Sequence, residues 1–100
     1  MTNKKNVLFA LGMAQKAGKL ASGDTAVQYA VKSGKALVVL LAEDASENSR
    51  KDILNMGKNY EIPVIVTLTK AEIGQAIGKA QRTAVAVIDK NFYKMIIKEF

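Results

Sequence analysis

Residues 19–34, KLASGDTAVQYAVKSG, combine residue types that can bind an anion or the edge of a base. Gly23 lies beside Ser22, Asp24 and Thr25, which are residue types that often cap helices, and directly before a short helical pattern. A helix that begins here leaves several backbone N–H groups of its first turn without partners inside the helix. Such a helix start attracts a phosphate, a carboxylate or the acceptor edge of a base.

The predicted helix that follows Gly23 has one apolar and one polar face. At about 100° per residue, Val27, Ala30 and Val31 cluster on the apolar side. The polar side consists of Thr25, Gln28, Tyr29 and Lys32. A solvated surface explains such a face as well as a binding site does. The surrounding charge is what favours a binding site.

Basic residues are concentrated in the first third of the chain. With 15 Lys and Arg against 9 Asp and Glu, the formal net charge is +6. Residues 1–35 hold six lysines and a single acid, Asp24, so this segment alone carries +5. An excess of one sign around one segment predicts a polyanionic partner. Nucleic acid is the favoured partner of this segment.

The composition argues against most classes of enzyme. The chain has no cysteine and no histidine, so it lacks a thiolate, the commonest metal ligand and the usual general base. Its glycines match neither the dinucleotide fingerprint nor the GKS/GKT phosphate loop. Glu43 and Asp44 are adjacent, and their favoured role is to cap the helix that follows, for which Asp44 and Ser46 are the candidate caps. We therefore expect no enzymatic activity, no cofactor and no metal.

Hydrophobic patterning predicts helices and strands that alternate along the whole chain. Continuous apolar runs indicate three buried strands at residues 36–42, 62–67 and 83–88, and residues 20–21 are a candidate for a very short strand. Helical periodicity predicts helices from residue 2 or 3 to 17 and over residues 24–33, 46–60, 69–78 and 90–100. We predict one domain over residues 1–100, an α/β/α sandwich of three layers around a largely parallel sheet.

The clearest local signal in the sequence is a helix start near residue 69. Thr69 and Glu72 have the spacing of a capping box, and Leu68 and Ile73 have that of the hydrophobic staple around it. This signal fixes the beginning of the fourth predicted helix.

Three predicted connections end or begin at strand edges. They are the start of the second helix at Gly23, the turn at Glu43 and Asp44, and the basic loop at residues 78–82. If they converge at one end of the sheet, they join helix-start N–H groups, polar side chains and positive charge around one concave site. Such a site suits RNA.

Five segments together resemble a known family. They are LGMAQKAGKLASG at residues 11–23, KSGKA at 32–36, LAEDA at 41–45, IPV at 62–64 and IGQAIGK at 73–79. In this order they resemble the kink-turn RNA-binding ribosomal protein family, and most closely its small bacterial YlxQ-type members. The resemblance covers nearly the whole chain. It implies a three-layer sandwich around a four-stranded mixed sheet whose short first strand lies near Leu20.

The resemblance also indicates how RNA would be read. In typical kink-turn binders the second helix opens with Gly-x-Asn-Glu-x-x-Lys, whose side chains read tandem sheared G·A pairs. The matching positions here are Gly23, Thr25, Ala26 and Tyr29, of which only the glycine agrees. Binding through phosphates and RNA shape is therefore favoured over the readout of a standard kink-turn.

The family's loop before the last strand, which covers a flipped-out nucleotide, corresponds to residues 77–83. Lys79 and Arg82 keep positive charge in that loop. We expect the basic residues to surround the helix start at Gly23. The full set of candidate RNA-binding residues is Lys16, Lys19, Ser22, Gly23, Asp24, Thr25, Gln28, Tyr29, Lys32, Glu43, Asp44, Gly78, Lys79, Gln81 and Arg82.

Three functional hypotheses remain open at this stage. The favoured one is a non-catalytic RNA-binding protein of ribosomal type, with a ribosomal or other non-coding RNA and a possible ribosomal or translation-related protein as partners. The second is a protein–protein interaction module on the same fold, and the third is an enzyme. No apolar run reaches the roughly 18 residues of a membrane span, so we expect a cytoplasmic location and no membrane partner.

Overall fold

Helices and strands alternate along the chain, as the sequence predicts. The structure is a computed structural model that describes residues 3–100, so a helix start at Thr2 lies outside the described residues. The helices are α1 (Lys4–Lys16), α2 (Asp24–Lys32), α3 (Glu47–Tyr60), α4 (Lys70–Ile77) and α5 (Lys90–Ile97). The strands are β1 (Leu20–Ser22), β2 (Val38–Leu41), β3 (Val64–Val66) and β4 (Ala84–Val87).

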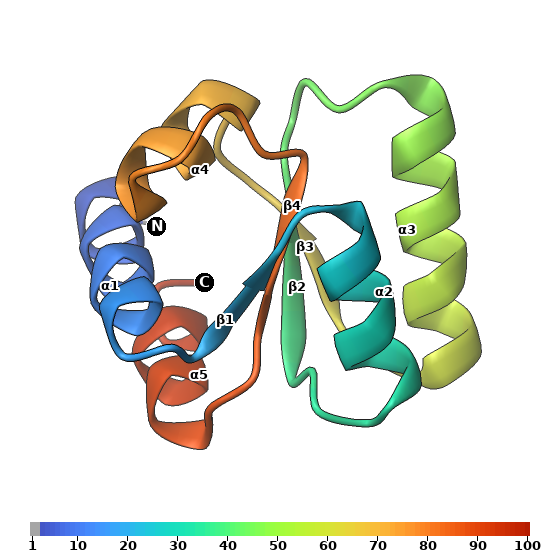
Figure 1. Cartoon of the computed structure of the whole chain (residues 1–100), viewed down its shortest axis with the longest axis horizontal. Coiled ribbons are helices and arrows are strands. Elements are labelled where there is room, and N and C mark those ends of the chain that lie inside the picture. Colours follow the sequence, from blue (N-terminus) through green and yellow to red (C-terminus); the bar gives the residue numbers. More distant parts are fainter. Residues whose placement is uncertain (1–2) are drawn as a thin grey trace.

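The helices form two layers on the two faces of a central sheet. Helices α1, α4 and α5 cover one face, and α2 and α3 cover the other (Figure 1). Successive side chains of a strand point to opposite faces, so Val38 and Leu40 belong to the first layer and Val39 and Leu41 to the second. The three-layer α/β/α sandwich predicted from the sequence is therefore confirmed.

The sheet is mixed, but it is not largely parallel as predicted. Its strand order is β1-β4-β2-β3, in which only β2 and β3 are parallel, whereas β4 is antiparallel to both β1 and β2. The cause is the path after β3. The chain leaves the sheet along α4 and returns beside it, because the backbone N–H of Arg82 donates to the carbonyl of Lys70 at 3.2 Å. The chain thus re-enters the sheet at the end at which β3 stops, so β4 runs in the direction opposite to β2 and β3.

Strand β3 lies at an edge of the sheet, which corrects the prediction of a strand buried on both faces. Val64 and Ile65 are only partly buried, and Val66 is exposed. Pro63 directly precedes β3, at the start of an edge strand, where the missing N–H costs no internal ladder bond. Ile65 packs against the cluster beneath α1, α4 and α5, and Val64 packs against the cluster beneath α2 and α3, so β3 contributes to both faces but has a neighbouring strand on one side only.

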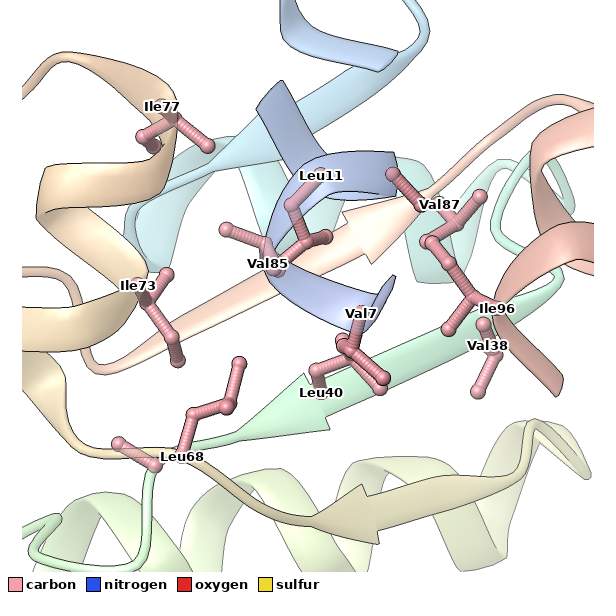
Figure 2. Close-up of a cluster of buried hydrophobic side chains, with 12 residues drawn as sticks. Val7, Leu11, Val38, Leu40, Leu68, Ile73, Ile77, Val85, Val87 and Ile96 are labelled. Atoms are coloured by element: carbon pink, nitrogen blue, oxygen red, sulfur yellow. The ribbon is translucent and has the colours of Figure 1, made fainter. Parts of the chain in front are cut away.

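The larger core cluster lies between the sheet and the layer of α1, α4 and α5. Figure 2 shows Leu40 of β2 beneath Val7 of α1, with Ile73 of α4 and Ile96 of α5 on either side. These four side chains are fully buried. The core therefore fixes α4, and with it the loop after α4, on the sheet.

The predicted capping box at the start of α4 is confirmed. The backbone N–H of Glu72 donates to Thr69 Oγ1 at 3.1 Å, and the N–H of Thr69 donates to Glu72 Oε1 at 2.9 Å. Leu68 and Ile73, the predicted staple, are both buried in the same cluster.

We expect Thr69→Ala to lower the free energy of unfolding by about 0.5–2 kcal/mol, because one N–H at the helix start loses its acceptor. Chemical denaturation measures the change. Thr69→Ser keeps the hydroxyl and should restore the stability, whereas Thr69→Val keeps only the shape. Equal stability of the Ser and Val variants would contradict a capping role.

Candidate nucleic-acid interface

The start of α2, the turn after β2 and the last residues of the predicted basic loop lie together at one end of the strands, where β2 ends and β4 begins. The N–H of Gly23 donates to the carbonyl of Ala84 at 3.4 Å, and the N–H of Ala42 donates to that of Thr83 at 2.8 Å. The N–H of Glu43 donates to the carbonyl of Leu68 at 2.7 Å. We call this region, where Gly23, residues 42–44, residues 68–70 and residues 82–84 meet, the site edge (Figure 1).

Helix α2 begins at the site edge without a side-chain cap. Its N-cap is Gly23, which has φ 92° and ψ 159° and makes no side-chain hydrogen bond. Ser22, Asp24 and Thr25 were expected to cap this helix, and they do not. The other four helices begin at side chains that accept a first-turn N–H, which are Asn3, Ser46, Thr69 and Asp89. The first turn of α2 therefore keeps its N–H groups available for a ligand.

The positive φ of Gly23 explains why a glycine occupies this position. A side chain with a Cβ rarely adopts φ 92°, whereas glycine does so readily. The conformation turns the chain from β1 directly into α2, with Asp24 and Thr25 exposed at the first turn. Val27 on the opposite side of the helix is buried.

The loop at residues 78–83 carries its two basic residues to different places. Lys79 donates its backbone N–H to the carbonyl of Gly74 at 2.9 Å, and Arg82 donates its own to that of Lys70 at 3.2 Å. The loop thus runs back along α4 from its C-terminal to its N-terminal end. Arg82 reaches the site edge, whereas Gly78 and Lys79 lie roughly 12 Å away, the length of an eight-residue helix.

The position of Arg82 is fixed by its own loop. Its Nη1 donates to the carbonyls of Ala80 and Gln81 at 3.2 and 3.1 Å. The guanidinium group has further N–H donors that these two bonds leave unused. Arg82 is the predicted base that the structure places at the site edge, on the side of α4, and Gln81 next to it is exposed.

Asp44 has a structural role at the site edge. Its Oδ1 accepts the backbone N–H of Lys70 at 2.8 Å, so it caps α4 and not α3. Of the two candidate caps of α3, Ser46 is confirmed, since its Oγ accepts the N–H of Ser49 at 3.2 Å, whereas Asp44 does not cap this helix. Glu43 beside Asp44 is exposed. The hydrogen bond between Asp44 and Lys70 ties the turn after β2 to the turn after β3.

The expectation that the basic residues surround Gly23 is wrong for most of them. Lys19 lies at the opposite edge of the sheet, where its carbonyl accepts the N–H of Ile88 at 3.1 Å. Lys32 is the last residue of α2, roughly 13 to 14 Å along the helix from Gly23. Lys16 lies in the last turn of α1, in a groove that Gly78 also lines. The basic residues that lie close together in the sequence are therefore spread over several surfaces of the folded protein.

The remaining predicted residues lie on the outer face of α2. Gln28 and Tyr29 are exposed, and the ammonium group of Lys35 is 5.7 Å from the centre of the Tyr29 ring. This distance is within the range of a cation–π contact. Tyr29 keeps 65% of its surface exposed and is free to stack on a ligand.

Lys70 is a further base at the site edge, and it is not among the residues predicted from the sequence. It is the first residue of α4, its N–H is bonded to Asp44 and its carbonyl to Arg82. The capping box at Thr69 is the sequence signal that indicates the position of Lys70. A residue directly after an N-cap at a strand end lies at the same edge as the other strand ends.

One of the N-terminal lysines is already paired with an acid. Lys4 Nζ lies 2.8 Å from Glu72 Oε2, which is the only ion pair among residues 3–100. The hydrogen bond to the Glu72 carboxylate raises the pKa of Lys4, and the same bond lowers the pKa of Glu72. Lys4 therefore contributes little to the attraction of a polyanion.

Other kinds of site are not found in the described part of the chain. Between residues 3 and 100, no group of three or more Asp and Glu side chains is placed to hold a metal ion. None of the helices in this range is long and apolar enough to cross a membrane.

Sequence comparison agrees with the resemblance found in the motifs. A family model for the ribosomal protein L7Ae/L30e/S12e/Gadd45 family matches residues 5–97. RNA-binding protein YlxQ of Enterococcus faecium is 35% identical over 92 residues, which are 92% of this chain and 88% of that protein. RNA-binding protein YlxQ of Bacillus subtilis (strain 168) is 37% identical over 87 residues, which are 87% of each chain.

Solved structures with the same fold include one at appreciable sequence identity. A protein of unknown function from Bacillus halodurans superposes with a TM-score of 0.87 at 33% identity, over 93% of this chain and 94% of that one. The 15.5kD RNA binding protein of Giardia lamblia superposes with a TM-score of 0.79 over 99% of this chain and 88% of that one. At 14% identity, the second similarity concerns the fold alone.

Proposed function

The chain belongs to the ribosomal protein L7Ae/L30e/S12e/Gadd45 family, and from this premise we propose that it is a small, non-catalytic RNA-binding protein of ribosomal type. Its similarity to two proteins named RNA-binding protein YlxQ supports the proposal. The net charge of +6 favours a polyanionic partner as well.

The observation that carries the proposal is the composition of the site edge. The uncapped start of α2 offers backbone N–H groups, and Arg82 and Lys70 add positive charge on the opposite side of the same edge. Backbone N–H groups and arginine are frequent donors to RNA phosphates. The edge is held by hydrogen bonds between four connections, so the donors are positioned before RNA binds.

Contacts to phosphates and to RNA shape carry this binding. At the positions where typical kink-turn binders have Asn, Glu and Lys, this chain has Thr25, Ala26 and Tyr29. Ala26 has no side-chain donor or acceptor, so it reads no base. Thr25 can donate one hydrogen bond, and Tyr29 can stack or donate. The expected ligand is a structured RNA that need not be a standard kink-turn.

A protein partner is the second candidate function. The observation that favours it is the loss of base-reading side chains on α2 together with the exposed Tyr29. A surface that lacks base-reading side chains and exposes an aromatic residue suits a protein partner of ribosomal or translation type. The two candidates differ in their dependence on salt and on Arg82.

We expect the protein to bind both a kink-turn RNA and a duplex RNA of equal length, with affinity that falls steeply as salt rises. Arg82→Ala should weaken binding to both RNAs and lower the log–log salt slope by roughly 0.7 to 0.9, the contribution of one phosphate contact. Fluorescence anisotropy of labelled RNA measures both quantities.

Lys58→Ala is the control for this experiment, because Lys58 is an exposed base in the last turn of α3, away from the site edge. Its affinity and salt slope should equal those of the unchanged protein. If neither RNA binds below millimolar concentration at low salt, the RNA proposal fails and the protein partner takes its place.

A further inference from the structure

A second surface with features of a nucleic-acid site lies between α1 and α4, outside the site edge. It is a groove of about 420 Å³. Phe9 and Met13 of α1 form one wall, and Gln75 of α4 and Gly78, which directly follows α4, form the other. The two helices approach closely at Gly12, where a Cβ would lie 3.1 Å from the carbonyl oxygen of Ala76. The groove is therefore open to solvent and runs between the closely packed helices α1 and α4.

The wall formed by α1 exposes an aromatic ring to solvent. Phe9 keeps 68% of its surface exposed, and Met13, one helical turn further on, keeps 41%. Neither side chain is needed by the core, which α1 reaches through Val7, Ala10 and Leu11 on its other face. An exposed ring beside a flexible thioether gives a flat, apolar platform on which a nucleobase can stack.

The two segments that surround this platform, residues 1–23 and 73–88, carry positive charge and no acidic residue. Lys5 precedes Phe9 by one helical turn, Lys16 lines the groove, and Lys79 follows Gly78 directly. Residues 1–23 contain no Asp or Glu, and neither do residues 73–88. Glu72, which borders the second segment, is already paired with Lys4. Such a surface is complementary to a polyanion that also presents apolar rings.

The groove and the site edge are joined by one continuous loop. Residues 78–83 begin at the groove with Gly78 and end at the site edge with Arg82, about 12 Å away along α4. This distance is short enough for a few nucleotides of one strand to span. An RNA held at the site edge therefore has a direct basic path to the groove.

We propose that the groove between α1 and α4 binds an unpaired nucleotide of the same RNA that the site edge holds. This inference rests on the proposed RNA-binding function. The base stacks on Phe9 and Met13, and Lys16 and Lys79 neutralise the flanking phosphates. Stacking on an aromatic side chain requires a base whose face is free, so the groove selects single-stranded segments next to a structured one.

A tryptophan at position 9 tests this contact directly, because the chain has no other tryptophan. The probes are a single-stranded 20-nucleotide oligouridylate and a blunt RNA duplex of equal length. We expect the single strand to quench the fluorescence of Phe9→Trp in a saturable manner, and the duplex to leave it unchanged. Tyr60→Trp, at an exposed site on α3, is the matched control and should respond to neither RNA.

Affinity gives a second measurement. Phe9→Ala should weaken binding of the single strand by about 5- to 150-fold, the range for losing one stacked base, while Phe9→Tyr keeps the ring and should restore most of it. Because Phe9 is exposed, the Ala variant should melt at the same temperature as the unchanged protein. Lys16→Ala should lower the salt slope by roughly 0.7.

The outcomes separate this inference from the proposed function. If RNA binding depends on Arg82, but Phe9→Trp is not quenched and Phe9→Ala binds normally, the groove is no RNA site and the inference fails alone. A protein partner then becomes the occupant to test. If no RNA binds at all, the proposed function fails first, and the inference fails with it.

Discussion

Leu40→Ala should be among the most destabilising single substitutions in this protein, lowering the free energy of unfolding by about 2–5 kcal/mol. Leu40 is fully buried in the middle of β2, in contact with the layer of α1, α4 and α5. Removing its side chain loses the transfer free energy of the buried carbons and leaves a cavity between rigid elements. Both effects add, since the close-packed neighbours in Figure 2 relax only in part.

Leu54→Ala is the matched control for this prediction. Leu54 lies on α3 with 40% of its surface exposed, so the same chemical change should alter stability by at most about 0.5 kcal/mol. Urea denaturation, with an unchanged slope against denaturant, measures both variants. A loss below about 0.5 kcal/mol for Leu40→Ala would mean that β2 is not the centre of the core.

Gly74→Ala is expected to disrupt both the stability of α4 and the position of the basic loop. A Cβ at Gly74 would meet the carbonyl oxygen of Ala80, and it would lie 2.8 Å from the carbonyl carbon of Ala80 and 3.0 Å from Gln81 Cα. In an open helix, Ala in place of Gly adds about 0.5–1 kcal/mol of stability. Here the clash is with backbone that cannot rotate away, and overpacking of this kind costs about 1–3 kcal/mol.

Denaturation and RNA titration together test this prediction. The loop has to move from α4, and Arg82 moves from the site edge with it, so RNA affinity should fall about as far as in Arg82→Ala. In the double variant Gly74→Ala/Arg82→Ala, the two losses should not add, because both remove the same contact. Gln75→Ala, at an exposed position one residue on, is the stability control. Additive losses in the double variant would show that the loop position does not control Arg82.

Much of the local structure follows from the sequence by itself. The capping box of Thr69 and Glu72 and the staple of Leu68 and Ile73 were predicted from spacing alone. The structure has both hydrogen bonds of the box and buries both staple residues in one cluster. The strands at residues 36–42 and 83–88 were visible as apolar runs because they are covered on both faces. The capping box and the staple depend on neighbours within a few residues, and an apolar run is itself a local property, so the sequence determines both directly.

Partners far apart in the sequence decided the rest. Asp44 was expected to cap the helix that follows it, but it accepts a bond from Lys70, 26 residues away. The edge position of β3 is equally invisible in its sequence, because an apolar run does not tell whether the strand is paired on one side or on both. Local patterns indicate that a residue caps a helix or faces a core, and tertiary contacts decide which helix and which core.

The composition of the candidate site shows the same division. Gly23, the polar residues after it and the basic loop were identified from sequence, since their types and spacing are local properties. The direction of β4 was not, and it decides the site: a parallel β4 would begin at the opposite edge, far from Gly23. The return of residues 78–83 along α4, which Gly74 allows, brings Arg82 to the site edge and leaves Lys79 beside the groove. Which lysines and arginines share a surface is thus set by strand pairing and helix packing, interactions that join segments the sequence keeps apart.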